Sequence, residues 1–266
     1  MASNTTSGAS ARELDIQLVA ATEMLPDLRV GANDSVWAPG GPAADAEALV
    51  EFAGRARYES FGNPNPRTAD TEAYVHHVME MGHRDLLEHA SATMFIRGLS
   101  YTAAREILDT PGLHVTRSSA PRTLPEALEV VVPADIKGDE QLERLFLRAV
   151  EDTNFVYNEL VAGLEEALAD EDNALVRTKR VQEAARAIMP QATDTPLLVT
   201  GSVAQWREFI VRCGGRLASP ETRAVSIGVL ELLRGRSPVL VDDLVVTRAD
   251  DPSGGGEGAE YVVSQI

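Results

Sequence analysis

The sequence contains very little cysteine and no long apolar run. Cys213 is the single cysteine among 266 residues, which excludes an intramolecular disulfide and predicts a reducing, cytoplasmic compartment. No segment approaches the roughly 18 uninterrupted apolar residues of a membrane helix, so neither a membrane span nor a membrane partner is expected. The opening MASNTTSGAS lacks the basic start and apolar centre of a secretory signal, and we expect residues 1–13 to form a disordered tail.

Positive charge is also scarce. The chain carries 24 Lys and Arg residues against 41 Asp and Glu residues, which gives a formal net charge of -17. This acidity argues against binding to DNA, RNA or an anionic membrane. It leaves room for a small nucleotide, because a local basic pocket can form on an acidic protein.

Common catalytic and metal-binding motifs do not occur either. The five histidines show no zinc spacing with cysteine, and H-E-x-x-H is missing, so we expect no metal. The phosphate-binding motifs G-x-G-x-x-G and G-x-x-x-x-G-K-[ST] and the hydrolase motif G-x-S-x-G are also missing. Pattern alone therefore indicates a soluble globular protein and selects no reaction.

What is present is a mixture of strand and helix signals. Alternating or apolar runs predict extended segments at 15–19, 91–100, 127–133, 195–202 and 237–246. Helical spacing predicts helices at 46–57, 71–82, 101–108, 141–168, 174–188, 203–213 and 220–233. The helix at 101–108 is expected to stop at Asp109-Thr110-Pro111-Gly112, with a polar loop after it. The predicted fold class is mixed α/β (α+β), with long helices in the second half.

One segment resembles a specific family. LLEHASATMFIRGLSYTAAREI, residues 86–107, resembles the flavin-dependent thymidylate synthases. Those proteins typically show E-H-x-x-F/x-F-x-I-x-G-x-S-R, a helix with a glutamate, and then R-H-R, seven residues and a serine. LVEFAGRARYESFGNPNP, ALVRTKRVQEAARAIMPQATDTPLLVTGSVAQWREFI and ETRAVSIGVLELL are similar to further parts of the family, in the same order. The resemblance implies the family's fold, a mixed sheet with long helices, in a single domain at 14–248, with a flexible tail at 249–266.

The resemblance also implies a chemistry. The family enzyme is a homotetramer that holds FAD, takes a hydride from NADPH and converts dUMP to dTMP with methylenetetrahydrofolate. The protein binds and orients these molecules, and its arginines neutralise their phosphates. For this chain the resemblance implies a homotetramer, or a hetero-oligomer with an active paralogue.

Several residues match positions that the family uses. The resemblance assigns four of them to cofactor binding: His89, Ser91, Arg117 and Ser202. It assigns four to substrate binding: Glu106, Ser119, Arg122 and Arg186. The catalytic residues are left unknown, with three candidates: Glu106, Ser119 and Arg212. Arg212 takes the place of the family's uracil-polarising arginine after a one-residue shift, whereas a gapless alignment puts Cys213 there.

The family's signature arginines are missing. Asp109-Thr110-Pro111 stands where the family has R-H-R, and Leu217 stands where it has a flavin-side histidine. The exchange of two guanidinium groups for a carboxylate and a proline changes the local charge by about three units. Each charge pair at ~4 Å is worth about 4 kcal/mol at an effective dielectric constant near 20. We therefore expect FAD and dUMP to bind weakly or not at all.

Structural roles compete with these assignments. His89 can be a buried histidine that supports the fold, Arg186 can make an ion pair, and Cys213 can be a small buried apolar residue rather than a reactive thiol. Arg117 and Arg122 can be solvated loop residues or can rebuild an anion site. Three functions stay open. The first is a degenerate homologue that serves as a non-catalytic or partner subunit. The second is an enzyme, with or without flavin, that acts on another nucleotide or a specialised metabolite, and the third is an active thymidylate synthase with a relocated motif.

Overall fold

The computed structural model describes residues 9–31, 34–62, 65–118, 128–248 and 261–266. The chain divides into two compact units, and each is described by itself. The hairpin unit comprises Met1–Asp15, Arg97–Arg105 and Arg117–Leu197, and the sheet unit comprises Ile16–Ile96, Glu106–Thr116 and Leu198–Ile266. Both units combine helices with strands, which confirms the expected α+β class. No helix among the described residues is both long and apolar enough to cross a membrane.

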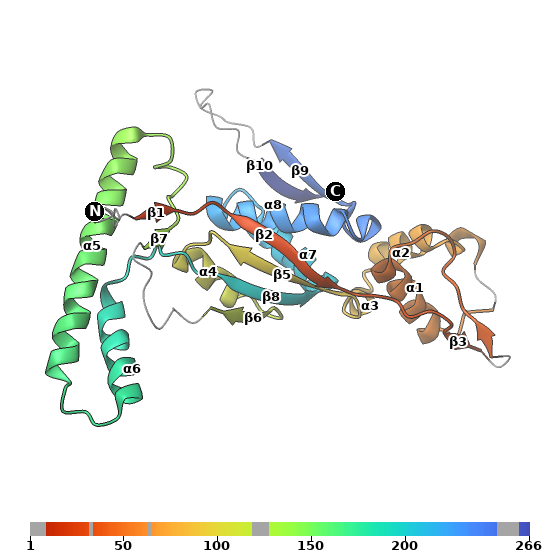
Figure 1. Cartoon of the computed structure of the whole chain (residues 1–266). Helices are drawn as coiled ribbons and strands as arrows, with labels where there is room; N and C mark the ends of the chain where they lie inside the picture. Colours follow the sequence, from red (N-terminus) through yellow and green to blue (C-terminus); the bar gives the residue numbers. More distant parts are fainter. Residues whose placement is uncertain (1–8, 32–33, 63–64, 119–127, 249–260) are drawn as a thin grey trace, which may run out of the picture. The chain divides into compact units, whose positions relative to one another are not determined.

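The sheet unit is built on four strands in the order β2-β5-β8-β6 (Figure 1). These strands and the two helices that follow β8 are β2 (Asp15–Ala21), β5 (Ser91–Arg97), β8 (Leu197–Ser202), β6 (His114–Arg117), α7 (Val203–Cys213) and α8 (Pro220–Arg234). The alternation of β5 sets its buried side, since Ala92, Met94 and Ile96 are all buried. The indole Nε1 of Trp206 in α7 donates to the carbonyl oxygen of Ala92 at 3.0 Å, so α7 covers this strand.

The rest of the sheet unit consists of helices from the N-terminal half of the chain and short elements from both halves. Its remaining elements are β3 (Arg29–Val30), β4 (Ser35–Val36), α1 (Asp45–Arg57), η1 (Pro66–Thr68), α2 (Thr71–Glu80), α3 (Arg84–Leu87), η3 (Pro238–Val241), β9 (Leu244–Arg248) and β10 (Tyr261–Gln265). A buried ion pair inside α1 joins Arg55 Nε to Glu51 Oε1 at 2.6 Å, and Thr71 donates to the same carboxylate. Asp70 caps α2 through the backbone N–H of Ala73, so this helix begins where the sequence predicts it.

The hairpin unit consists mainly of two long helices. Its elements are β1 (Ser10–Ala11), β7 (Glu129–Val130), α5 (Glu140–Ala167), α6 (Ala174–Ala185) and η2 (Arg186–Ile188). Figure 1 shows α5 and α6 side by side as an antiparallel hairpin, in green and green-blue. Asp139 and Asn173 cap the two helices. A small core of Leu128, Val130 and Val150 anchors the hairpin to β7. Helix α4 (Tyr101–Leu108) begins with residues of this unit and ends with residues of the sheet unit.

The helix predictions agree with the structure to within a few residues, whereas five short strands were missed, among them the hairpin of β3 and β4. His114–Arg117 forms β6 inside the expected polar loop, and Tyr261–Gln265 forms β10 inside the expected flexible tail. Ser10–Ala11 pairs with β7 inside the expected N-terminal tail. Strands β1 and β6 depend on partners far away in the sequence, β7 and β8, which local patterns do not reveal. Pro238–Val241 is a 3-10 helix rather than the start of the last strand, and the single domain at 14–248 stays a prediction.

Candidate functional site

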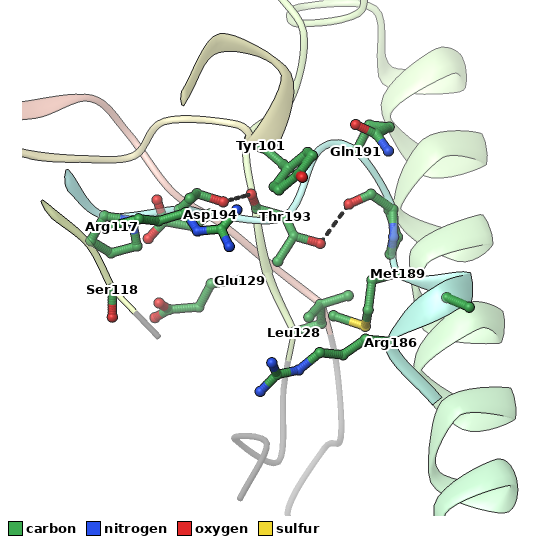
Figure 2. Close-up of a pocket in the computed structure, with 14 residues that line it drawn as sticks. Tyr101, Arg117, Ser118, Leu128, Glu129, Arg186, Met189, Gln191, Thr193 and Asp194 are labelled. Atoms are coloured by element: carbon green, nitrogen blue, oxygen red, sulfur yellow. Dashed lines mark hydrogen bonds between the residues drawn. The ribbon is translucent and has the colours of Figure 1, made fainter. Parts of the chain in front are cut away.

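The hairpin unit contains a pocket of roughly 520 Å³ (Figure 2). The start of α4, the end of β6, β7 and the turn from η2 toward β8 supply its walls. Figure 2 shows Arg117 and Arg186 approaching the pocket from different sides. The structure therefore brings one predicted cofactor residue and one predicted substrate residue to a single cavity.

An aromatic side chain accompanies Arg117 in this pocket. The guanidinium carbon of Arg117 lies 5.6 Å from the ring centroid of Tyr101, within the range of a cation–π contact. Sequence reasoning missed Tyr101 as a site residue. The signal was available, because the family motif ends in Ser-Arg and this chain has Ser100-Tyr101 there. A tyrosine supplies a ring and a hydroxyl where the motif supplies a positive charge.

Two carboxylates of the pocket wall have structural partners. Asp194 accepts hydrogen bonds from the backbone N–H groups of Gly98 at 2.9 Å and Leu99 at 3.1 Å. Arg12 pairs with Glu129 at 2.9 Å and lies 3.8 Å from Asp194. The backbone donors and Arg12 offset part of the negative charge of this wall.

Arg186 is the first residue of η2, directly after α6. Burial raises the pKa of the Tyr157 hydroxyl in α5, and the positive charge of Arg186 offsets part of that rise. Thr193 Oγ1 donates to the carbonyl oxygen of Pro190 at 2.7 Å and fixes the turn that follows. The position of Arg186 is thus set by the α5–α6 packing and by this turn.

A second cluster of predicted residues lies in the sheet unit, around Thr110. Thr110 is only 5% exposed, and its Oγ1 donates to the carbonyl oxygen of Glu106 at 3.1 Å. The same hydroxyl accepts a hydrogen bond from the guanidinium group of Arg212, at the end of α7. Ser219 Oγ donates to the Glu106 carboxylate at 3.4 Å. Glu106 and Arg212, two catalytic candidates, are therefore engaged with neighbouring side chains of the chain itself.

Cys213 lies beside this cluster and is buried. Burial raises the pKa of the Cys213 thiol above its ordinary value, and the hydrogen bond and charge of Arg212 offset only part of this rise. A buried, protonated thiol is unreactive, so the interpretation of Cys213 as a small buried apolar residue agrees with the structure.

The predicted cofactor residues of the sheet unit have different environments. Ser202 caps α7, where it accepts from the backbone N–H of Gln205 at 3.1 Å and donates to the Glu88 carboxylate. The Ser91 backbone N–H donates to Thr22 Oγ1 at 2.8 Å. His89 is exposed, so the expectation of a buried, fold-supporting histidine is wrong. It follows α3 in a short connection to β5, which leaves its ring on the surface.

The remaining sequence predictions concern two residues after β6, the position of the family's flavin-side histidine and a metal site. Ser119 and Arg122 lie outside the described residues. Leu217, at the position of the family's flavin-side histidine, has a fully exposed side chain. Among the described residues no group of three or more His, Cys, Asp and Glu side chains could hold a metal ion.

Comparison with known proteins identifies the family. A family model described as "Thymidylate synthase complementing protein" matches residues 42–239, which is most of the chain. A flavin-dependent thymidylate synthase of Corynebacterium aurimucosum is 45% identical over 243 residues, covering 91% of this chain and 96% of the relative. The protein of the same name from Corynebacterium efficiens is 44% identical over 239 residues, covering 90% of this chain and 93% of the relative. One from Mycobacterium tuberculosis is 37% identical over 242 residues, covering 90% and 92%.

The chain thus belongs to the thymidylate synthase complementing protein family, whose curated relatives are named flavin-dependent thymidylate synthases. The family assignment made from residues 86–107 is confirmed, and so is the fold class.

Proposed function

We propose that this chain is a degenerate member of its family, which has lost the conversion of dUMP to dTMP and serves as a non-catalytic or partner subunit. The observation that carries the proposal is the contact between Thr110 and Arg212. Thr110 occupies the centre of the position where the family has R-H-R, and it is buried against a catalytic candidate. Because Asp109-Thr110-Pro111 stands in place of R-H-R, the end of α4 carries no guanidinium group of the motif.

The residues on either side of Thr110 do not fit FAD. Asp109 is exposed and presents a carboxylate where the family presents an arginine to phosphate, and Pro111 has neither a charge nor a backbone N–H. An aspartate repels a pyrophosphate group, whereas the family's guanidinium groups attract it through forked hydrogen bonds. Leu217 adds an apolar side chain at the expected flavin side. We therefore infer that FAD binding is weak or lost, and we assign no reaction step to flavin in this chain.

The pocket of the hairpin unit is compatible with the second function. Arg117, Arg186 and Tyr101 provide two positive charges and an aromatic ring around a cavity of roughly 520 Å³. Such a lining suits a small anionic ligand with a planar group, which is consistent with an enzyme for another nucleotide or a specialised metabolite. We keep this as the alternative, because no group in the pocket identifies a reaction.

Partner and compartment follow from the same reasoning. A subunit without its own chemistry acts through assembly, so we propose a homo-oligomer, or a hetero-oligomer with an active paralogue. The single cysteine supports a cytoplasmic location.

Rescue of a thymidine-requiring bacterial strain tests the loss of activity. The chain is expressed alone, beside the Corynebacterium aurimucosum relative as the positive control. We expect growth without thymidine only for the relative, with comparable amounts of both proteins on an immunoblot. Growth with this chain alone overturns the proposal. Growth that requires this chain together with a catalytically weakened relative favours the partner role.

A further inference from the structure

The charged side chains of the hairpin-unit pocket are balanced in sign. Four of the described residues that line it carry a formal charge: Arg117 and Arg186 are positive, and Glu129 and Asp194 are negative. Figure 2 shows the Glu129 side chain between Arg117 and Arg186 in this view. A pocket that holds only an anion gains from an excess of positive charge, and the two carboxylates reduce that excess. The balance therefore points to a ligand that carries charges of both signs.

Arg12 pairs with the two carboxylates but cannot neutralise both. Its Nη2 atom lies 2.9 Å from Oε1 of Glu129 and 3.0 Å from Oε2, and its Nε atom lies 3.8 Å from Asp194. One positive charge thus faces two negative charges, and this wall of the pocket keeps a net negative charge. A dianionic phosphate group is repelled by that wall, whereas an ammonium group of a ligand is attracted to it.

Glu129 is the carboxylate that can contact a ligand cation. Its side chain is 41% exposed, whereas the side chain of Asp194 is only 5% exposed. Asp194 accepts from the backbone N–H groups of Gly98 and Leu99, which fix it in the wall. An ionised carboxylate has about four lone-pair positions, and one nitrogen of Arg12 does not use all those of Glu129. Glu129 therefore keeps the capacity to accept a hydrogen bond from a ligand ammonium group.

Apolar and aromatic side chains form much of the remaining lining. Leu128, Met189 and Pro196 lie there together with the ring of Tyr101. The guanidinium carbon of Arg117 lies 5.6 Å from the Tyr101 ring centroid, so one positive charge is held beside an aromatic surface. A volume of roughly 520 Å³ is in the range of small-molecule sites. An aromatic group of a small ligand thus fits beside the charged groups, because aromatic rings pack favourably against one another.

We propose that this pocket binds an amino acid with an aromatic side chain, in its zwitterionic form. Arg117 and Arg186 hold the ligand carboxylate, since guanidinium groups form forked hydrogen bonds with carboxylates. Glu129 accepts a hydrogen bond from the ligand ammonium group, and the aromatic side chain packs against Tyr101 and Leu128. A ligand of this class satisfies both signs of the lining, whereas a phosphomonoester satisfies only one.

The inference rests on the alternative function proposed for this pocket, and it narrows the ligand from an anion to a zwitterion. It does not depend on the loss of thymidylate synthesis. Growth without thymidine contradicts that loss, whereas the amino acid site is supported or contradicted by binding measurements. The two proposals can therefore fail separately.

Isothermal titration calorimetry of the full chain tests the ligand class. The probe is L-phenylalanine, and its analogues hydrocinnamate and phenethylamine lack the amino group and the carboxylate, respectively. We expect one L-phenylalanine to bind per chain and each analogue to bind about tenfold more weakly, because each loses one charge-assisted hydrogen bond. No binding of L-phenylalanine at millimolar concentration overturns the proposal, and so does equal or tighter binding of hydrocinnamate or dUMP.

Glu129→Gln tests the partner of the ammonium group, because it removes the negative charge and keeps the size of the side chain. We expect about tenfold weaker binding of L-phenylalanine, with hydrocinnamate binding unchanged or tighter. Glu171→Gln is the matched control, since Glu171 pairs with Arg180 at 3.6 Å, has a side chain that is 29% exposed and does not line the pocket. We expect this control to bind both probes like the wild type. Equal weakening of both probes by Glu129→Gln contradicts the role of Glu129.

Arg117→Gln tests the partner of the carboxylate. We expect about tenfold weaker binding of L-phenylalanine and of hydrocinnamate, with phenethylamine binding unchanged. The melting temperature of each variant checks that the chain is folded, and a merely structural defect would weaken all three probes alike. An Arg117→Gln variant that binds L-phenylalanine like the wild type overturns the proposal.

Discussion

Replacing Thr110 with valine is expected to separate the end of α4 from Arg212. Valine keeps the branched shape of the buried side chain and removes only the hydroxyl group. That hydroxyl donates to the Glu106 carbonyl oxygen at 3.1 Å and accepts from Arg212. A hydrogen bond to a charged group contributes about 1.5–3 kcal/mol when it is shielded from water. Arg212 is exposed and regains water, so we expect Thr110→Val to lower the free energy of unfolding by about 1–2 kcal/mol.

The matched control is Thr178→Val. Thr178 Oγ1 also bonds the carbonyl oxygen four residues earlier, that of Ala174 at 2.9 Å, but Thr178 is exposed on α6. We expect this variant to change stability by less than about 0.5 kcal/mol. Urea unfolding of both variants, each combined with Arg212→Met, measures the coupling between Thr110 and Arg212. A coupling energy near zero refutes the claim that Thr110 holds Arg212.

Three further predictions concern the frame around the site. Burial alone would raise the pKa of Asp243, but the hydrogen bonds and charge of Arg207 lower it below the ordinary 3.8. We expect Asp243→Asn to lower stability at pH 7 by about 2 kcal/mol, and the difference should fade as the pH drops below that ordinary value. Burial raises the Cys213 pKa, so iodoacetamide should label it slowly at pH 8 in the folded chain and quickly in urea; equal rates contradict its burial. Because the pKa is higher in the folded state, the contribution of this thiol to stability is lost as the pH rises past its ordinary 9.0. Gly98 has a φ of +68°, and a Cβ there would lie 1.9 Å from the Glu13 carbonyl oxygen, so Gly98→Ala should sharply reduce the yield of folded protein on gel filtration.

The parts of the fold that were predictable from the sequence are those fixed by local chemistry. The Pro111-Gly112 pair ends α4 where predicted, and Asp70 caps α2 because its side chain reaches the first turn. Strand β6 was not predictable, since its pairing beside β8 is a property of the folded chain. The pairing of Arg117 with Tyr101 was missed for the same reason.

For the candidate site, too, the sequence located residues but did not reveal their contacts. The family resemblance found Glu106 and Arg212, but only the three-dimensional structure showed that Thr110 links their helices. The resemblance also located Ser202. Only the structure showed that Ser202 caps α7 and donates a hydrogen bond to the Glu88 carboxylate. Substitutions at a signature can be located in a sequence, but the new contacts that replace it depend on side chains from distant segments.

A titration of the purified chain with FAD tests the central claim most directly. Quenching of flavin fluorescence is followed up to high micromolar FAD, with the Corynebacterium aurimucosum relative as the control for intact binding. We expect saturable quenching with the relative and none with this chain, because Asp109-Thr110-Pro111 replaces the arginine signature. Saturable, stoichiometric binding of FAD to this chain in the low micromolar range would contradict it.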